Sequence, residues 1–271
     1  MLRAYKLIVL AVLFTVPALA AEDKFFNSEG VRIRYTDQGS GEPVILIHGF
    51  SVNQEHEWVD TGVLAKLDQQ YRVIAIDVRG HGKSDKPHDG NAYGRQMGED
   101  VVRLMRSLHI PRAHIIGYSM GSMITARLLC DHPESFLTAT VGGGAGFRHL
   151  TPEYTKLSAQ IEAPLDRGEL TPSWATLHDD PVVLLAVLKS WPSLFWDEAK
   201  MRRDQVPVLA VVGSNDPWLA AAQDLKAVLP SVKLVVIPGA THAGATGALY
   251  RPEFIAAVQS FLAEHRAAPA P

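Results

Sequence analysis

The chain has 271 residues, of which 47% are hydrophobic and 20% charged, a balance typical of an ordinary soluble globular protein with one large domain. Its net charge of -3, without a basic stripe carrying interleaved aromatic residues, argues against a nucleic-acid partner. The single cysteine, Cys130, excludes an intramolecular disulfide and a cysteine-based zinc site, and we expect it to be a buried, inert thiol.

The N-terminus has the pattern of a signal peptide, residues 1–20. Arg3 and Lys6 are basic, residues 7–16 form an uncharged apolar core, and residues 17–20 end in the small side chains that a signal peptidase reads. We expect cleavage after Ala20, export to the periplasm or the medium, and no stable membrane insertion afterwards. The alternative is an uncleaved membrane anchor, although the apolar stretch is short against the roughly 20 residues that a spanning helix needs.

From residue 25 onward, strand-like runs alternate with helical patterns. The first two runs flank a turn at Glu29-Gly30 and predict a hairpin, whereas the later runs are unbroken and apolar, as in parallel strands covered on both faces. This alternation predicts an α/β fold with a mostly parallel, doubly wound sheet. The expected strands are 25–27, 31–35, 43–47, 73–76, 113–116, 136–141, 208–212 and 234–237, and the expected helices are 59–69, 94–108, 122–131, 219–229 and 252–265.

Residues 148–205 break the alternation. They follow a glycine-rich segment, 142–146, and have the pattern of helices only, at 152–161, 181–189 and 194–203. We therefore expect a core of residues 21–147 and 206–271, with 148–205 inserted as an all-helical cap over the carboxyl edge of the sheet. Its tryptophans, Trp174, Trp191 and Trp196, either pack the cap onto the core or line an apolar pocket, and the two roles are compatible.

The sequence Gly117-Tyr118-Ser119-Met120-Gly121 lies between an expected strand and an expected helix. In this context a G-x-S-x-G motif predicts a nucleophilic serine on a tight, strained turn. Side chains at the two glycine positions would collide with neighbouring backbone, so glycine is needed there. The positive end of the following helix favours the negative charge that develops when the serine attacks a carbonyl.

Two further loops follow parallel strands and would share the same sheet edge as Ser119. Asp216 follows the expected strand 208–212, and His242 follows 234–237 in a glycine-rich loop. We expect His242 to act as the base for Ser119 and Asp216 to orient His242, although Asp216 could also be only a helix N-cap. Other acids that could take this role, all worse placed, are Asp179, Asp180 and Asp224.

The oxyanion of the transition state needs hydrogen-bond donors. We expect them to be the backbone N–H groups of Met120, at the head of the helix, and of Phe50, in the loop after strand 43–47. Each such donor is worth roughly 2.7–4 kcal/mol of barrier. His48 is expected to organise this loop rather than to act as a second base. The loop 77–85 lacks the spacing of a phosphate-binding loop, and we interpret it as ordered structure.

With the order Ser119, Asp216, His242, the chain resembles the α/β-hydrolase fold superfamily over about residues 25–262. The serine at the elbow differs from the aspartate of dehalogenases and epoxide hydrolases of this fold. The sequence His48-Gly49-Phe50-Ser51 lacks the glycine-rich segment of proline iminopeptidases and of ring-cleavage carbon–carbon hydrolases. What remains is similar to serine carboxylesterases and to cofactor-free perhydrolases.

The resemblance implies a serine hydrolase that cleaves small to medium carboxylic esters through an acyl-enzyme. It implies a small-molecule ester as the partner, and neither a metal nor an organic cofactor. Two alternatives stay open. One is a carbon–carbon bond hydrolase or perhydrolase with the same triad, and the other is a low-turnover ligand-binding protein on the same scaffold.

If residues 1–20 are a cleaved signal peptide, the mature chain begins at Ala21 and stays in solution without detergent. Intact-mass analysis of the protein recovered from an exporting bacterial host measures this directly. A chain that keeps Met1 and sediments with the membranes would contradict the expectation.

Overall fold

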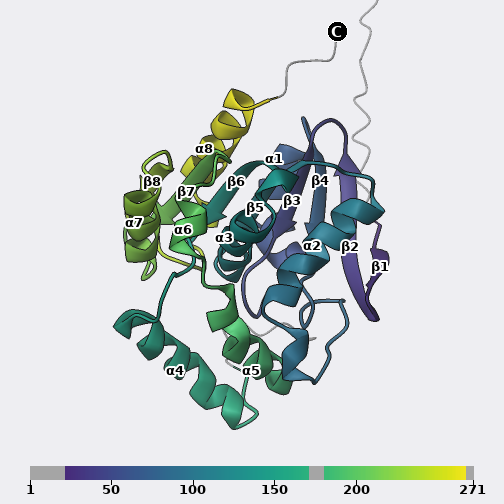
Figure 1. Ribbon diagram of the computed structural model, residues 1–271, viewed down its shortest axis with the longest axis vertical. Coiled ribbons are helices and arrows are strands. Elements are labelled where there is room, and N and C mark those ends of the chain that lie inside the picture. Colours follow the sequence, from purple (N-terminus) through teal and green to yellow (C-terminus); the bar gives the residue numbers. More distant parts are fainter. Residues whose placement is uncertain (1–21, 171–179, 267–271) are drawn as a thin grey trace, which may run out of the picture.

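The computed structural model describes residues 22–170 and 180–266, called the described ranges below. Its centre is one sheet of eight strands in the order β1-β2-β4-β3-β5-β6-β7-β8 (Figure 1). The strands are β1 (Lys24–Ser28), β2 (Val31–Gly39), β3 (Pro43–Ile47), β4 (Arg72–Ile76), β5 (Ala113–Tyr118), β6 (Phe136–Gly142), β7 (Val208–Gly213) and β8 (Lys233–Ile237). Strands β3 to β8 are parallel, and only the β1–β2 and β2–β4 pairs are antiparallel. The predicted α/β fold with a mostly parallel sheet is confirmed.

Both faces of the sheet are covered by helices, which explains why the central strands are apolar along their whole length. On one face, Ile45 and Ile115 pack with side chains of α2 (Arg95–Ser107) and α3 (Met120–Asp131), which cross in front of the sheet in Figure 1. On the other face, Val44 and Val73 pack with α1 (Val63–Leu67) and α8 (Pro252–Glu264). Helix α7 (Leu219–Val228) follows β7 and packs against β7 and β8.

The described part of segment 148–205 is helical and lies mostly outside the sheet layers. Helix α4 (Pro152–Asp166) and helix α5 (Pro181–Ser190) pack against each other below the sheet in Figure 1. Each has a proline in its first turn and a capping side chain before it, Thr151 and Asp180. Trp174 and Asp179 lie outside the described ranges.

The helix expected at 194–203 is wrong in its extent. A 3₁₀ turn (Trp191–Leu194) follows α5, and α6 (Glu198–Met201) has only four residues. Between them the backbone is held in an extended conformation, because the Trp196 N–H donates to the Phe147 carbonyl at 2.9 Å. Helix α6 starts only after this contact, where the Asp197 side chain accepts a hydrogen bond from the Lys200 N–H.

The helix expected at 59–69 is also wrong in its extent, because α1 covers only Val63–Leu67. A π-helical turn (Glu55–Val59) comes first, and α1 begins four residues later, after Gly62 takes a left-handed conformation with a φ of 74°. Two contacts accompany this earlier turn. Burial of Trp58 pulls the earlier turn inward, and the Thr61 hydroxyl donates to the Glu57 carbonyl at 2.6 Å. Single π-helical turns occur frequently at functional sites.

Cys130 is buried in α3, as expected, and burial raises the pKa of its thiol. None of the helices in residues 22–170 and 180–266 has the length and apolar character needed to cross a membrane. The expected signal peptide, residues 1–20, lies outside these ranges.

Candidate active site

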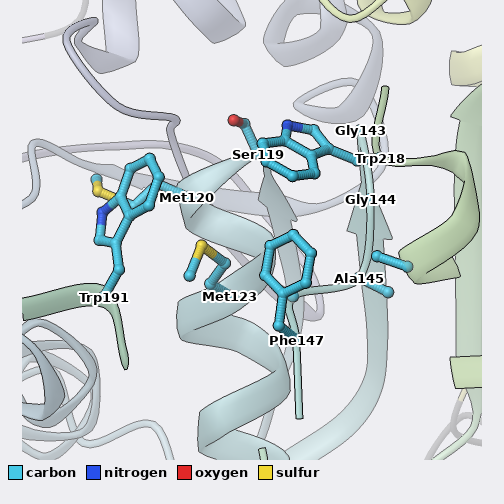
Figure 2. Close-up of a pocket in the computed structure, with 11 residues that line it drawn as sticks. Ser119, Met120, Met123, Gly143, Gly144, Ala145, Phe147, Trp191 and Trp218 are labelled. Atoms are coloured by element: carbon cyan, nitrogen blue, oxygen red, sulfur yellow. The ribbon is translucent and has the colours of Figure 1, made fainter. Parts of the chain in front are cut away.

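Ser119 lies at the turn between β5 and α3, where its backbone is strained. Its φ of 54° and ψ of -115° place a side-chain-bearing residue in a region that such residues rarely adopt. A Cβ atom on Gly117 would overlap the carbonyl oxygen of Gly121, and one on Gly121 would overlap that of Ile47. Only glycine fits at either position, as the motif predicted. Figure 2 shows the serine at the tip of the strand, directly before the helix.

Ser119, His242 and Asp216 form a continuous hydrogen-bonded chain. The Nε2 atom of His242 lies 2.8 Å from Ser119 Oγ, and its Nδ1 atom lies 2.9 Å from Asp216 Oδ2. Because a carboxylate can only accept, Nδ1 carries the hydrogen and Nε2 is left to accept the serine proton. The structure therefore brings together the three side chains that were expected from the sequence.

Asp216 contacts both His242 and the residue that precedes α7, although the N-cap of this helix is Trp218 and not Asp216. Its Oδ1 atom accepts a hydrogen bond from the Trp218 N–H at 2.9 Å at the start of α7, while Oδ2 faces His242. The side chain is completely shielded from solvent. Of the rival acids, Asp224 pairs with Arg148, and Asp180 caps α5 and contacts His88.

Tyr118 holds the histidine loop and was not predicted. Its hydroxyl donates to the carbonyl of His242 at 2.6 Å, and the two rings lie 5.6 Å apart. Burial raises the pKa of the Tyr118 phenol, and the negative charge of Asp216 raises it further. The phenol therefore stays protonated and keeps its donor. A tyrosine before the serine of G-x-S-x-G gives no local signal of this contact.

The backbone expected to stabilise the oxyanion passes close to the serine. A Cβ atom on Gly49 would lie 3.2 Å from Ser119 Cβ. Within the described ranges, the N–H groups of Phe50 and Met120 donate to no protein acceptor, so both are free to bind substrate. Their role in an oxyanion hole stays a prediction.

The two loops that were expected to be structural are confirmed as such. His48 is fully buried, accepts a hydrogen bond from the Val78 N–H at 3.0 Å and contacts the Gly49 carbonyl at 2.7 Å. In the loop 77–85, buried Asp77 accepts hydrogen bonds from two backbone N–H groups, and Arg79 pairs with buried Asp100 at 2.6 Å. Buried carboxylates are stable only when they are paired in this way.

A cavity of about 620 Å³ opens in front of Ser119 and His242. A smaller crevice on the other side of the serine lies between Trp191 and Trp218, with Phe147 and Met123 beneath it (Figure 2). Trp191, after α5, borders both spaces, whereas Trp196 is buried in the protein interior and borders neither. The larger apolar side chains that line the cavity of about 620 Å³ are Phe50, Val52, Leu157, Ile161, Trp191 and Trp218. Nowhere in residues 22–170 and 180–266 do three or more His, Cys, Asp or Glu side chains cluster as metal ligands would.

Glu57 is a polar residue of the cavity wall that sequence reasoning missed. It is 8% exposed, and its Oε2 atom accepts a hydrogen bond from the Gly49 N–H. Burial raises the pKa of its carboxyl to about 8. The one available signal was a charged residue directly before Trp58, in the loop after the first parallel strand. The expected helix at 59–69 began too late to include it.

Comparisons with known proteins agree with this architecture. A sequence profile described as alpha/beta hydrolase fold matches residues 42–156. The dihydrolipoyllysine-residue acetyltransferase component of the acetoin cleaving system of Cupriavidus necator is 36% identical over 129 residues, covering 47% of this chain and 33% of that protein. The 2-hydroxy-6-oxo-6-(2'-aminophenyl)hexa-2,4-dienoic acid hydrolase of Metapseudomonas resinovorans is 28% identical over 220 residues, covering 72% of this chain and 74% of that protein. The chain thus spans a third of the length of the first relative and about three quarters of the second.

A solved structure has the same fold as this chain. Est816, described as an N-acyl homoserine lactone degrading enzyme, has a TM-score of 0.71 and 26% identity, covering 88% of this chain and 100% of that one. The family and these neighbours support a hydrolase. The strand order, the matching profile and the structural likeness together show that the chain has the alpha/beta hydrolase fold.

Proposed function

We propose that the chain is a serine hydrolase that cleaves small to medium carboxylic esters through an acyl-enzyme. The observation that carries this proposal is the hydrogen-bonded chain from Ser119 through His242 to Asp216, at the mouth of an apolar cavity. A nucleophile within hydrogen-bond reach of a base, with the base oriented by a third group, is the arrangement that acyl transfer needs.

In the proposed reaction, Ser119 Oγ attacks the ester carbonyl carbon while His242 Nε2 takes its proton. Asp216 keeps the imidazole in the required tautomer and stabilises the imidazolium that forms. The imidazolium then gives its proton to the departing alcohol, which leaves an acyl group on the serine. Water, deprotonated by the same histidine, attacks this acyl group and releases the carboxylic acid and the free serine.

The negative charge of each tetrahedral intermediate lies on the former carbonyl oxygen. We assign its stabilisation to the N–H groups of Phe50 and Met120, which have no protein acceptor within the described ranges. The N-terminus of α3 adds a positive partial charge directly behind the serine. Preorganised donors of this kind are usually the largest single contribution to such catalysis.

The cavity supports a substrate of modest size. A volume of about 620 Å³, with mostly apolar walls, is in the range of pockets that enclose a small organic molecule. The similar Est816 is described as acting on a lactone, which is a cyclic ester. We further propose that residues 148–205 cap this cavity over a core of 21–147 and 206–271. Leu157 and Ile161 of α4 and Trp191 contribute to its wall.

A second candidate is hydrolysis of a carbon–carbon bond with the same three residues. It is favoured by the likeness to the dienoic acid hydrolase, which extends over 72% of this chain. Ester and carbon–carbon substrates are distinguished by their products. If the protein releases the alcohol of a simple ester much faster than it cleaves the carbon–carbon bond of a vinylogous diketone, the ester proposal is favoured.

For the proposed triad, we expect Ser119→Ala and His242→Ala to lower kcat on p-nitrophenyl butyrate by about 10⁶-fold and Asp216→Asn by about 10⁴-fold. The residues act as a unit, so either of the first two changes removes nearly all acceleration due to the triad. Asp224→Asn is the matched control, because it makes the same change in a carboxylate that pairs with Arg148 instead. Near-normal turnover of folded Asp216→Asn would contradict the assignment.

The tryptophans of segment 148–205 give a second prediction. Trp191→Phe should shift the preference among p-nitrophenyl esters toward longer acyl or alcohol chains, because Trp191 borders the cavity. Trp196→Phe should lower the melting temperature but leave the chain-length preference unchanged, because Trp196 is buried away from the cavity. Equal chain-length profiles for both variants and the wild type would show that Trp191 serves packing only.

A further inference from the structure

Glu57 lines the wall of the active-site cavity, but its carboxyl has no role in the proposed reaction. It lies on the π-helical turn (Glu55–Val59), and the Gly49 N–H holds its Oε2 atom. A Cβ atom on Gly49 would lie 3.2 Å from Glu57 Oε2, 3.4 Å from Glu57 Oε1 and 3.2 Å from Ser119 Cβ. The carboxyl and the serine therefore flank the same small space.

The second oxygen of this carboxyl is open to the cavity. Among residues 22–170 and 180–266, no protein group forms a hydrogen bond with Glu57 Oε1. None of the residues that line the cavity is a lysine or an arginine, so no cation there offsets a carboxylate. The titratable groups that line the cavity with Glu57 are His56 on its own turn, Tyr118 at the end of β5, His242 after β8, and Tyr250 before α8.

These surroundings keep the carboxyl neutral near pH 7. Burial raises its pKa to about 8, although the hydrogen bond from Gly49 acts in the opposite direction. Oε2 already accepts from the Gly49 N–H, which leaves the acidic hydrogen to Oε1. A hydrogen-bond donor thus faces the cavity next to the nucleophile.

We propose that Glu57 is a substrate-binding residue that donates a hydrogen bond from Oε1 to a second acceptor oxygen of the bound ester. The preferred substrates are then esters that carry an ether, keto or amide oxygen close to the scissile carbonyl. This inference rests on the proposed ester hydrolase function and names the substrate class of the same site. Ionisation of Glu57 removes the donor and places a negative charge beside the developing oxyanion, which slows the attack of Ser119.

The first test compares the wild type with Glu57→Gln as a function of pH. The glutamine amide keeps both contacts, because its oxygen can accept from Gly49 and its NH₂ group can donate to the substrate. We expect the wild-type kcat/KM on p-nitrophenyl butyrate to fall about tenfold between about pH 7.5 and about pH 9.5, and Glu57→Gln to lack this fall. The rate at which a fluorophosphonate labels Ser119 should behave in the same way, because labelling needs the same attack. Identical profiles of both proteins would overturn the proposal.

The second test asks directly whether Glu57 is neutral. A carboxyl with a folded-state pKa of about 8 and an ordinary value of 4.5 stabilises the fold fully below pH 4.5, and this contribution is lost as the pH rises through 8. The glutamine of Glu57→Gln cannot ionise, so the stability of this variant does not fall in this way as the pH rises. The melting temperature of Glu57→Gln minus that of the wild type should therefore increase from about pH 5 to about pH 9. A difference that stays constant over this range would contradict a neutral Glu57.

The third test uses pairs of esters that differ by one oxygen in place of a methylene. On the acyl side the pair is p-nitrophenyl methoxyacetate and butyrate, and on the alcohol side it is 2-methoxyethyl acetate and butyl acetate. In Glu57→Met, the preference for the oxygen-containing member of one pair should fall about two- to tenfold, whereas Glu57→Gln should keep it. Melting curves identify a variant that fails to fold, and in that case the pH profiles of the wild type and Glu57→Gln still decide the proposal.

These tests distinguish a wrong role for Glu57 from a wrong proposed function. If the wild type hydrolyses the esters but neither pair responds to Glu57→Met, the role of Glu57 is wrong and the ester hydrolase proposal stands. If the folded wild type is labelled at Ser119 but hydrolyses none of the four esters, the proposed function itself is wrong.

Discussion

The geometry of the site depends on the close contact of three chain segments around Ser119. The end of β5, the first turn of α3 and the end of β3 meet so tightly that Gly117 and Gly121 leave no room for a Cβ atom. This contact fixes Ser119 at a φ of 54°, which an isolated chain would avoid at a cost of order 1–3 kcal/mol. The surrounding parallel sheet makes this conformation stable, because β5 lies between β3 and β6, near the centre of the sheet. The strain keeps Oγ at the sheet edge, where the partner loops can reach it.

The partner residues reach the serine because the parallel strands all end at the same edge. Asp216 and His242 follow β7 and β8, and their loops are tied together by backbone contacts such as that from the Asn215 N–H to the Ala240 carbonyl, at 2.9 Å. Tyr118 adds a second link from β5 to the histidine loop. The relative positions of the three reactive side chains are thus set by the rigid sheet and by these short loops, rather than by segment 148–205.

Most of the sheet and the meeting of Ser119, Asp216 and His242 could be predicted, because their signals are local. Apolar runs mark buried parallel strands, and the two glycines mark the turn. The contacts that were missed arise only when the chain folds back on itself, and no pattern of neighbouring residues marks them. Glu57 is buried only because the π-helical turn (Glu55–Val59) folds against Gly49, and Tyr118 finds its acceptor 124 positions away. The helix at 194–203 was wrong for the same reason, since the carbonyl of Phe147 holds Trp196 in an extended conformation.

The most direct measurement is the position of the covalent adduct that a fluorophosphonate forms with the folded wild-type protein. Such probes react with a serine only when a neighbouring base activates it. Peptide mapping by mass spectrometry should find one adduct, on the peptide that contains Ser119, and Ser119→Ala should remain unlabelled while it keeps its melting temperature. An adduct on a different serine, or no adduct on the folded wild type, would contradict the assignment of Ser119 as the nucleophile.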